Sequence, residues 1–66
     1  MDSRRLRYFV QIVDSGSITR AAALSGVAQP ALSQQLAILE NELKVKLLNR
    51  SFSGVTPTPA GRILYA

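Results

Sequence analysis

The sequence predicts one small, mainly α-helical domain with three helices, a short two-stranded hairpin and the start of a fourth helix. Three observations support this fold class. The chain has 66 residues, 47% of them hydrophobic and 18% charged, which is enough for one core and too few for a second. Apolar residues recur at helical spacing through most of the first 43 positions. Turn-forming residues then separate two short extended segments.

The first predicted helix begins with Asp2 as its N-cap and ends at about position 14. Its apolar face has i, i+3, i+4 and i+7 spacing and comprises Leu6, Phe9, Val10 and Val13. Arg4, Arg5 and Arg7 lie near its start, where the helix dipole disfavours positive charge. These arginines indicate either a contact outside the domain or, with equal weight, an ordinary solvated face.

The second predicted helix is about two turns long. Ser17 is a natural N-cap, the helix begins at Ile18, and Gly26 ends it. The third helix opens at Gln29 with Pro30 in its first turn, where a missing N–H costs nothing. Its inward stripe comprises Leu32, Leu36, Leu39 and Leu43.

The outer faces of the third helix are polar near its start, at Gln29, Ser33, Gln34 and Gln35. Negative charge follows at Glu40 and Glu42, which would repel phosphates, so any contact with nucleic acid is expected from the first half of the helix.

The remainder predicts a β-hairpin followed by a helix. The turn-rich segment 51–54 separates two short strands, and Pro57 must end the second strand because it cannot donate a ladder hydrogen bond. Thr58 and Pro59 then form an N-cap and first helical position. We expect residues 59–66 to be the truncated start of a longer helix.

A short helix, a glycine turn and a second helix with a polar N-terminal face form the layout of a helix-turn-helix. Glutamine binds adenine N6 and N7 in a bidentate manner, serine contacts a base or a phosphate, and a helix N-terminus offers N–H groups to phosphate. The competing interpretation is that Gln29, Ser33 and Gln34 simply coat the wet face of a helix.

The composition excludes several other functions. A net charge of +4 favours a polyanionic partner. The chain has no Cys and no His, and its four carboxylates form no pair, so we expect no catalytic residues, no metal site and no cofactor. Its apolar stretches are too short to span a bilayer, which predicts no membrane partner and a cytoplasmic location.

Several ordered motifs resemble the N-terminal domain of LysR-type transcriptional regulators. They are Leu6–Phe9 with Val13, Gly16–Ala22, Gln29–Leu36, Leu39–Glu40 with Leu43, Leu47–Arg50 and Val55–Thr58 with Ala60 and Gly61. Segments Ala31–Gln35 and Val55–Thr58 further resemble the nitrogen-assimilation-control subgroup of that family.

The resemblance implies a winged helix-turn-helix over residues 1–58 that binds double-stranded operator DNA, with the recognition helix at about 29–43 in the major groove. It also implies a homodimer or tetramer for the intact protein, a small-molecule effector bound by a domain outside this chain, and a monomeric isolated fragment. The positions that it assigns to DNA binding are Gln29, Pro30, Ser33, Gln34, Arg50, Ser51, Ser53, Arg4 and Arg5, with Thr19 and Arg20 as lesser candidates.

The sequence departs from this family pattern in four places. Gln34 stands where many members carry Arg, which changes the expected base preference. Lys44 replaces a glycine, so a left-handed cap is harder to form, and Ser25 replaces a leucine, so core filling is expected to be imperfect. Finally, no basic residue lies between Arg50 and Arg62, which predicts weak anchoring of the wing.

Two further function classes stay open. One is a protein-interaction module whose apolar surface would include Tyr8, Ile12, Ile63 and Tyr65. The other is a cationic membrane-surface peptide, which is disfavoured because the basic residues are spread over several elements.

Overall fold

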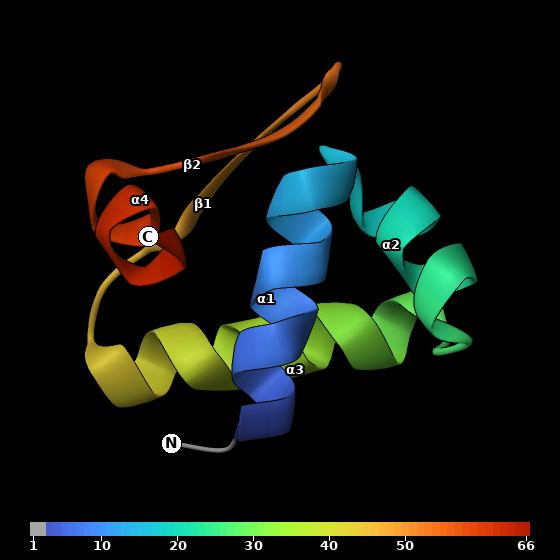
Figure 1. Ribbon diagram of the computed structural model, residues 1–66, viewed down its shortest axis with the longest axis horizontal. Helices are drawn as coiled ribbons and strands as arrows, with labels where there is room; N and C mark the ends of the chain where they lie inside the picture. The colour runs from blue at the N-terminus through green and yellow to red at the C-terminus, as the bar shows by residue number, and fades with distance from the viewer. Residues whose placement is uncertain (1–2) are drawn as a thin grey trace.

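The computed structural model describes residues 3–66, which form four helices and one two-stranded antiparallel sheet (Figure 1). In chain order the elements are α1 (Ser3–Ser15), α2 (Ile18–Ser25), α3 (Gln29–Leu43), β1 (Leu48–Ser51), β2 (Gly54–Pro57) and α4 (Pro59–Tyr65). The predicted order of three helices, hairpin and fourth helix is confirmed. The predicted N-cap at Asp2 lies outside the described residues.

The core lies where α1 and α2 pack against α3 and against each other. In Figure 1, α1 crosses α3, while α2 lies beside the N-terminal end of α3. The buried side chains are Phe9, Ile12, Ile18, Ala21, Ala22, Leu32, Leu36, Leu39, Leu47 and Leu48. The predicted leucine stripe of α3 is therefore confirmed at three positions, and Leu43 is half-buried beside them.

The buried face of α1 differs from the prediction. Ile12 is 0% exposed, so it cannot belong to an exposed apolar surface as proposed from the sequence. The reason is that α1 is covered by β2 as well as by α2 and α3, a contact that the sequence pattern does not contain. Phe9 and Ile12 therefore point inward, whereas Val10 and Val13 are only half-buried.

Both ends of α2 have the predicted local chemistry. The Ser17 hydroxyl oxygen caps α2 by accepting the backbone N–H of Arg20 at 3.2 Å. Gly26 ends α2 with a left-handed backbone at φ 70°, a conformation that glycine adopts without steric cost. The chain then enters α3 within three residues, which fixes the angle between the two helices.

Ser25 makes hydrogen bonds at the position where the sequence predicts imperfect filling of the core. The Ser25 hydroxyl lies 2.7 Å from the Gln11 side-chain oxygen and 2.6 Å from the Ala21 carbonyl oxygen. The neighbouring Leu24 is 75% exposed and so does not fill the position from the side. Serine thus links α2 to α1 by hydrogen bonding instead of by burial.

The exit from α3 keeps the left-handed cap despite its lysine. Lys44 has φ 58° and its N–H bonds the Asn41 carbonyl, while the N–H of Val45 bonds the Glu40 carbonyl at 3.2 Å. The side chain makes this conformation costlier than it would be for glycine, by about 1 kcal/mol. The left-handed cap, which lysine makes harder to form than glycine, is therefore present in this structure.

The hairpin is antiparallel and tightly closed. Leu48 pairs with Pro57 at the open end and Ser51 with Gly54 at the tip, which leaves a two-residue turn. As predicted, the second strand ends at Pro57, and the Thr58 hydroxyl then caps α4 by accepting the N–H of Gly61 at 3.0 Å.

We expect Leu36→Ala to lower the free energy of unfolding by about 2–5 kcal/mol, because the leucine is 2% exposed in a core of few side chains. Leu24→Ala is the matched control and should change it by no more than about 0.5 kcal/mol. Urea denaturation followed by circular dichroism measures both. Equal losses in the two variants would show that the α3 stripe is not the core.

Candidate nucleic-acid interface

The first two turns of α3 present polar side chains to solvent. Gln29, Pro30 and Gln34 are exposed and Ser33 is half-buried. The N-cap residue, Ala28, has no side-chain acceptor, so no side chain caps the first N–H groups of this helix. The four predicted residues thus lie together with uncapped backbone donors, an arrangement that suits an anionic or hydrogen-bonding ligand.

Thr19 and Gln29 meet across the turn between the helices. The Thr19 hydroxyl donates a hydrogen bond of 3.2 Å to the side-chain oxygen of Gln29. Thr19 lies in the first turn of α2 and both residues are exposed. The lesser candidate Arg20 follows Thr19 and is also exposed.

The hairpin carries the remaining predicted residues, Arg50, Ser51 and Ser53, all exposed. The Ser51 hydroxyl lies 3.2 Å from both the Gly54 carbonyl oxygen and the Ser53 hydroxyl, so it braces the turn internally. Phe52, between the two serines, is 108% exposed at the tip. The hairpin tip projects toward the side of the molecule occupied by α2 (Figure 1).

The hairpin rests on the turn between α1 and α2. The N–H of Val55 bonds the Gly16 carbonyl oxygen at 3.1 Å. A side chain at Gly54 would place its β-carbon 2.5 Å from that same oxygen, which is too close for real atoms. Glycine at position 54 thus lets the hairpin lie directly on the backbone beside the start of α2.

Glu40 fixes the base of the hairpin, a role that the sequence analysis missed. Its carboxylate accepts the backbone N–H of Leu47 at 2.7 Å and of Leu48 at 3.3 Å. From the sequence, Glu40 is expected only to repel phosphate. The feature of the sequence that indicates this role is the apolar pair Leu47 and Leu48. Burial of these leucines leaves two backbone N–H donors that need an acceptor.

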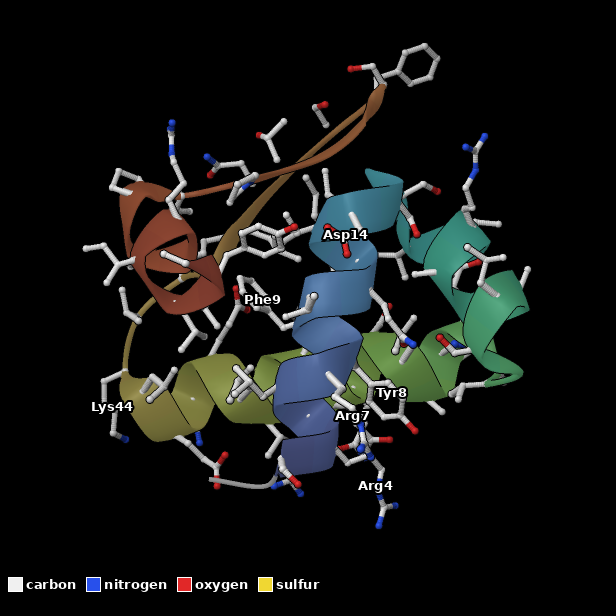
Figure 2. The ribbon with its side chains drawn as sticks, viewed as in Figure 1. Arg4, Arg7, Tyr8, Phe9, Asp14 and Lys44 are labelled. Carbon is white, nitrogen blue, oxygen red and sulfur yellow. The ribbon has the colours of Figure 1, made fainter. Side chains whose placement is uncertain are left out.

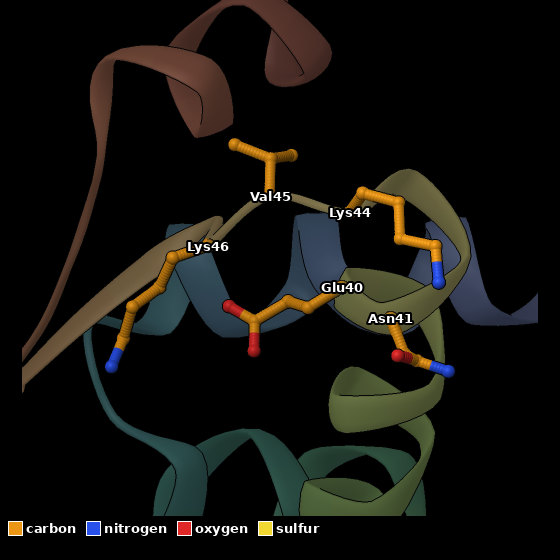
Figure 3. Close-up of a pocket in the computed structure, with 5 residues that line it drawn as sticks. All are labelled: Glu40, Asn41, Lys44, Val45 and Lys46. Atoms are coloured by element: carbon orange, nitrogen blue, oxygen red, sulfur yellow. The ribbon is translucent and has the colours of Figure 1, made fainter.

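An open hollow of about 450 Å³ adjoins this contact, lined by Glu40, Asn41, Lys44, Val45 and Lys46 (Figure 3). The Glu40 side chain extends from α3 toward the segment before β1, and the two lysines point to opposite sides of it. The Glu40 carboxylate already accepts two backbone N–H groups at the base of the hairpin, so we assign this hollow a structural role in supporting the hairpin.

The arginines of α1 divide between two environments. The Arg5 Nε donates to the Gln35 side-chain oxygen at 2.8 Å, and its Nη1 lies 3.8 Å from the Glu42 carboxylate, so Arg5 is turned toward α3. Arg4 is exposed and lies with Arg7 at the N-terminal end of α1, opposite Asp14 (Figure 2). Arg5 is therefore held by Gln35, in the middle of α3, and by Glu42, near the C-terminal end of that helix.

Asp14 ties α4 to α1. Its carboxylate accepts a hydrogen bond from the Tyr65 hydroxyl, and this bond, with the charge of the carboxylate, raises the pKa of Tyr65 above its ordinary 10.0. The neutral hydroxyl is the donor, so the contact persists below about pH 10 and is lost as the pH rises through the raised value.

Within residues 3–66 no group of three or more His, Cys, Asp or Glu could hold a metal ion. Among the helices of this described part, none has the length and apolar character to cross a membrane.

Residues 3–62 match the family model described as bacterial regulatory helix-turn-helix protein, lysR family. The nitrogen assimilation regulatory protein nac of Escherichia coli (strain K12) is 63% identical over 65 residues, which are 98% of this chain and 21% of that protein. The chain thus spans about a fifth of the length of this curated relative. The predicted resemblance to the family, and to nitrogen assimilation regulators within it, is confirmed.

Two solved structures share the fold. A complex of the BenM DNA-binding domain with catB site 1 DNA has a TM-score of 0.94 and 46% identity, covering 98% of this chain and 73% of that one. A complex of the CbnR DNA-binding domain with DNA has a TM-score of 0.95 and 37% identity, covering 98% and 75%. The fold is accordingly a winged helix-turn-helix, as predicted, in which β1 and β2 form the wing.

We expect Glu40→Ala to detach the base of the wing, because two backbone donors would lose a charged acceptor. The free energy of unfolding should fall by about 1–3 kcal/mol, and amide exchange at Leu47 and Leu48 should accelerate. Glu42→Ala is the control, since its carboxylate makes only the longer contact with Arg5. Unchanged exchange at the two leucines in Glu40→Ala would contradict this role.

Proposed function

Because the chain belongs to the lysR family of bacterial regulatory helix-turn-helix proteins, we propose that it is the sequence-specific DNA-binding domain of a transcriptional regulator. The proposal depends chiefly on one observation: the hydrogen-bonding side chains Gln29, Ser33 and Gln34 lie together in the first two turns of α3, whose N-terminus has no side-chain cap. The relatives with DNA-bound structures, BenM and CbnR, lend it support.

In this proposal the N-terminal half of α3 enters the major groove. Gln29 and Gln34 read base edges, Ser33 contacts a base or a phosphate, and Pro30 packs against the groove wall. α3 has 15 residues and rises about 1.5 Å per residue, so its two ends lie roughly 20 Å apart. Glu40 and Glu42 lie near the C-terminal end of α3 and are thereby kept away from the phosphates that flank its N-terminal end.

The wing and α2 hold the DNA backbone in the same proposal. Arg50, Ser51 and Ser53 contact the backbone from the wing, and Arg20 contacts it from α2, where Thr19 lies beside Gln29. In this proposal Arg4 lies near the DNA backbone, outside the segment that the N-terminal end of α3 contacts. Arg5 reaches a phosphate only by giving up Gln35 and Glu42, so its share of the affinity is the smallest of the arginines.

We extend the proposal to the whole protein as follows. Residues 1–58 form the DNA-binding domain and 59–66 begin a linker helix, while a further domain binds a small-molecule effector. The intact regulator works as a dimer or tetramer in the bacterial cytoplasm. It performs no catalysis, in keeping with relatives that are regulators.

We expect Gln29→Ala and Ser33→Ala each to weaken binding to a selected duplex by about 1–3 kcal/mol, with thermal stability nearly unchanged. Asn41→Ala is the matched control, because it removes an exposed amide from the opposite end of the same helix. Fluorescence anisotropy with a labelled duplex measures the affinities, and a salt titration separates base contacts from phosphate contacts.

Loss of stability without loss of specificity would contradict the assignment of α3 as the recognition helix. Retention on vesicles in place of duplex DNA would support a membrane-surface peptide instead.

The 66-residue chain should be monomeric at micromolar concentration. On α4, Ile63 is 79% and Tyr65 42% exposed, and two side chains fall far short of the roughly 1,200 Å² that a stable interface buries. Sedimentation equilibrium tests this prediction. A dimer that persists on dilution would indicate that this apolar surface is itself an interaction site, as the protein-interaction reading requires.

A further inference from the structure

The hydrogen bond between Thr19 and Gln29 constrains the side chain that the proposed function places against the bases. Glutamine has three rotatable side-chain bonds, and ordering it costs about as much as ordering any long side chain. An exposed glutamine at a helix start samples several rotamers unless something holds it. In this structure the Thr19 hydroxyl holds its oxygen at 3.2 Å.

The contact also determines what Gln29 presents outward. The carbonyl oxygen has two lone pairs, and Thr19 occupies one. The amide is planar, so anchoring its oxygen leaves the second lone pair and the two N–H donors of the same fork for a ligand. The major-groove edge of adenine offers N6–H₂ as a donor and N7 as an acceptor. A ligand for this edge must therefore present one acceptor beside one donor, as the free lone pair and an N–H of Gln29 do.

Thr19 itself sits on a rigid support. It follows Ile18, which is buried, and precedes Ala21 and Ala22, which are buried too. The hydroxyl of Ser17 caps the same turn. The backbone that carries Thr19 is therefore held in place by the core and by the cap, and the choice among the χ1 rotamers of Thr19 alone sets the position of its hydroxyl.

We propose that Thr19 is a positioning residue that determines base specificity: its hydroxyl pre-orients the Gln29 amide for adenine. This inference rests on the proposed function, and it gives Thr19 a role through Gln29 in place of its own contact with DNA. α2 thus takes part in reading the sequence, although only α3 touches the base.

The test compares Thr19→Val, which keeps the shape and removes the hydroxyl, with Thr19→Ser, which keeps the hydroxyl. A randomised duplex library selected with the unmodified chain gives the preferred base at each position, and the position that loses its preference in Gln29→Ala is the one that Gln29 reads. Binding to the four duplexes that differ only there is then measured for each variant, alongside a duplex of unrelated sequence.

We expect the unmodified chain to favour adenine at that position and Thr19→Val to reduce the preference by roughly threefold to tenfold, the factor for one net hydrogen bond. Thr19→Ser should retain it. Affinity for the unrelated duplex and the salt slope should be unchanged, and Thr19→Val should have no effect when added to Gln29→Ala.

Three results would overturn the inference. One is a uniform loss of affinity for all duplexes with a shallower salt slope, which would mean that Thr19 binds a phosphate directly. The second is an unaltered preference in Thr19→Val, and the third is a preference for cytosine, which would require the amide to present its oxygen alone. Failure of the proposed function is distinct, because the unmodified chain would then select no sequence at all.

Discussion

One constraint governs this domain: α3 must fill the core and face the ligand at the same time. Burial of Leu32, Leu36 and Leu39 against α1 and α2 fixes the rotation of α3 about its axis. Successive residues are about 100° apart around a helix, so fixing Leu32 inward turns Ser33 and Gln34 toward solvent. The reading surface is therefore a consequence of hydrophobic packing, and a change in the stripe would rotate it.

Polar contacts fix the relative positions of the elements where apolar packing alone would allow them to shift. Leucine side chains tolerate some sliding of one element past another, whereas a hydrogen bond at 2.7–2.8 Å does not. Glu40 ties the C-terminal half of α3 to the base of the wing, and Gln35 with Glu42 holds Arg5 of α1. Of the charged groups in these contacts, the sequence alone suggests that Arg5 is available for phosphate and that Glu40 and Glu42 would repel it. Through these contacts, three charged side chains of this small domain, Arg5, Glu40 and Glu42, stabilise the arrangement of its own elements.

The sequence predicts the elements well and the side-chain partners poorly. Ser17, Gly26 and Thr58 act within a few residues of their own position, so local rules locate the helix ends correctly. Ile12 was misplaced because the wing covers α1 from outside the helix pattern. The partners of Arg5 and Glu40 lie 30 and 7 residues away and depend on how the elements cross, which no local rule contains. The polar first turn of α3 was predictable because it belongs to one short segment.

Gly61 of α4 restricts which substitutions this sequence can accept during evolution. A β-carbon at Gly61 would stand 2.1 Å from the carbonyl oxygen of Leu47, a backbone atom that Thr58 also holds through its N–H at 2.9 Å. Gly26, by contrast, has open space around it and needs only a left-handed backbone, which asparagine adopts at modest cost. Substitution should therefore accumulate at position 26 and be purged at position 61. Together with Gly54, which the backbone oxygen of Gly16 excludes from substitution in the same way, Gly61 is a position by which divergent chains with this wing can be recognised.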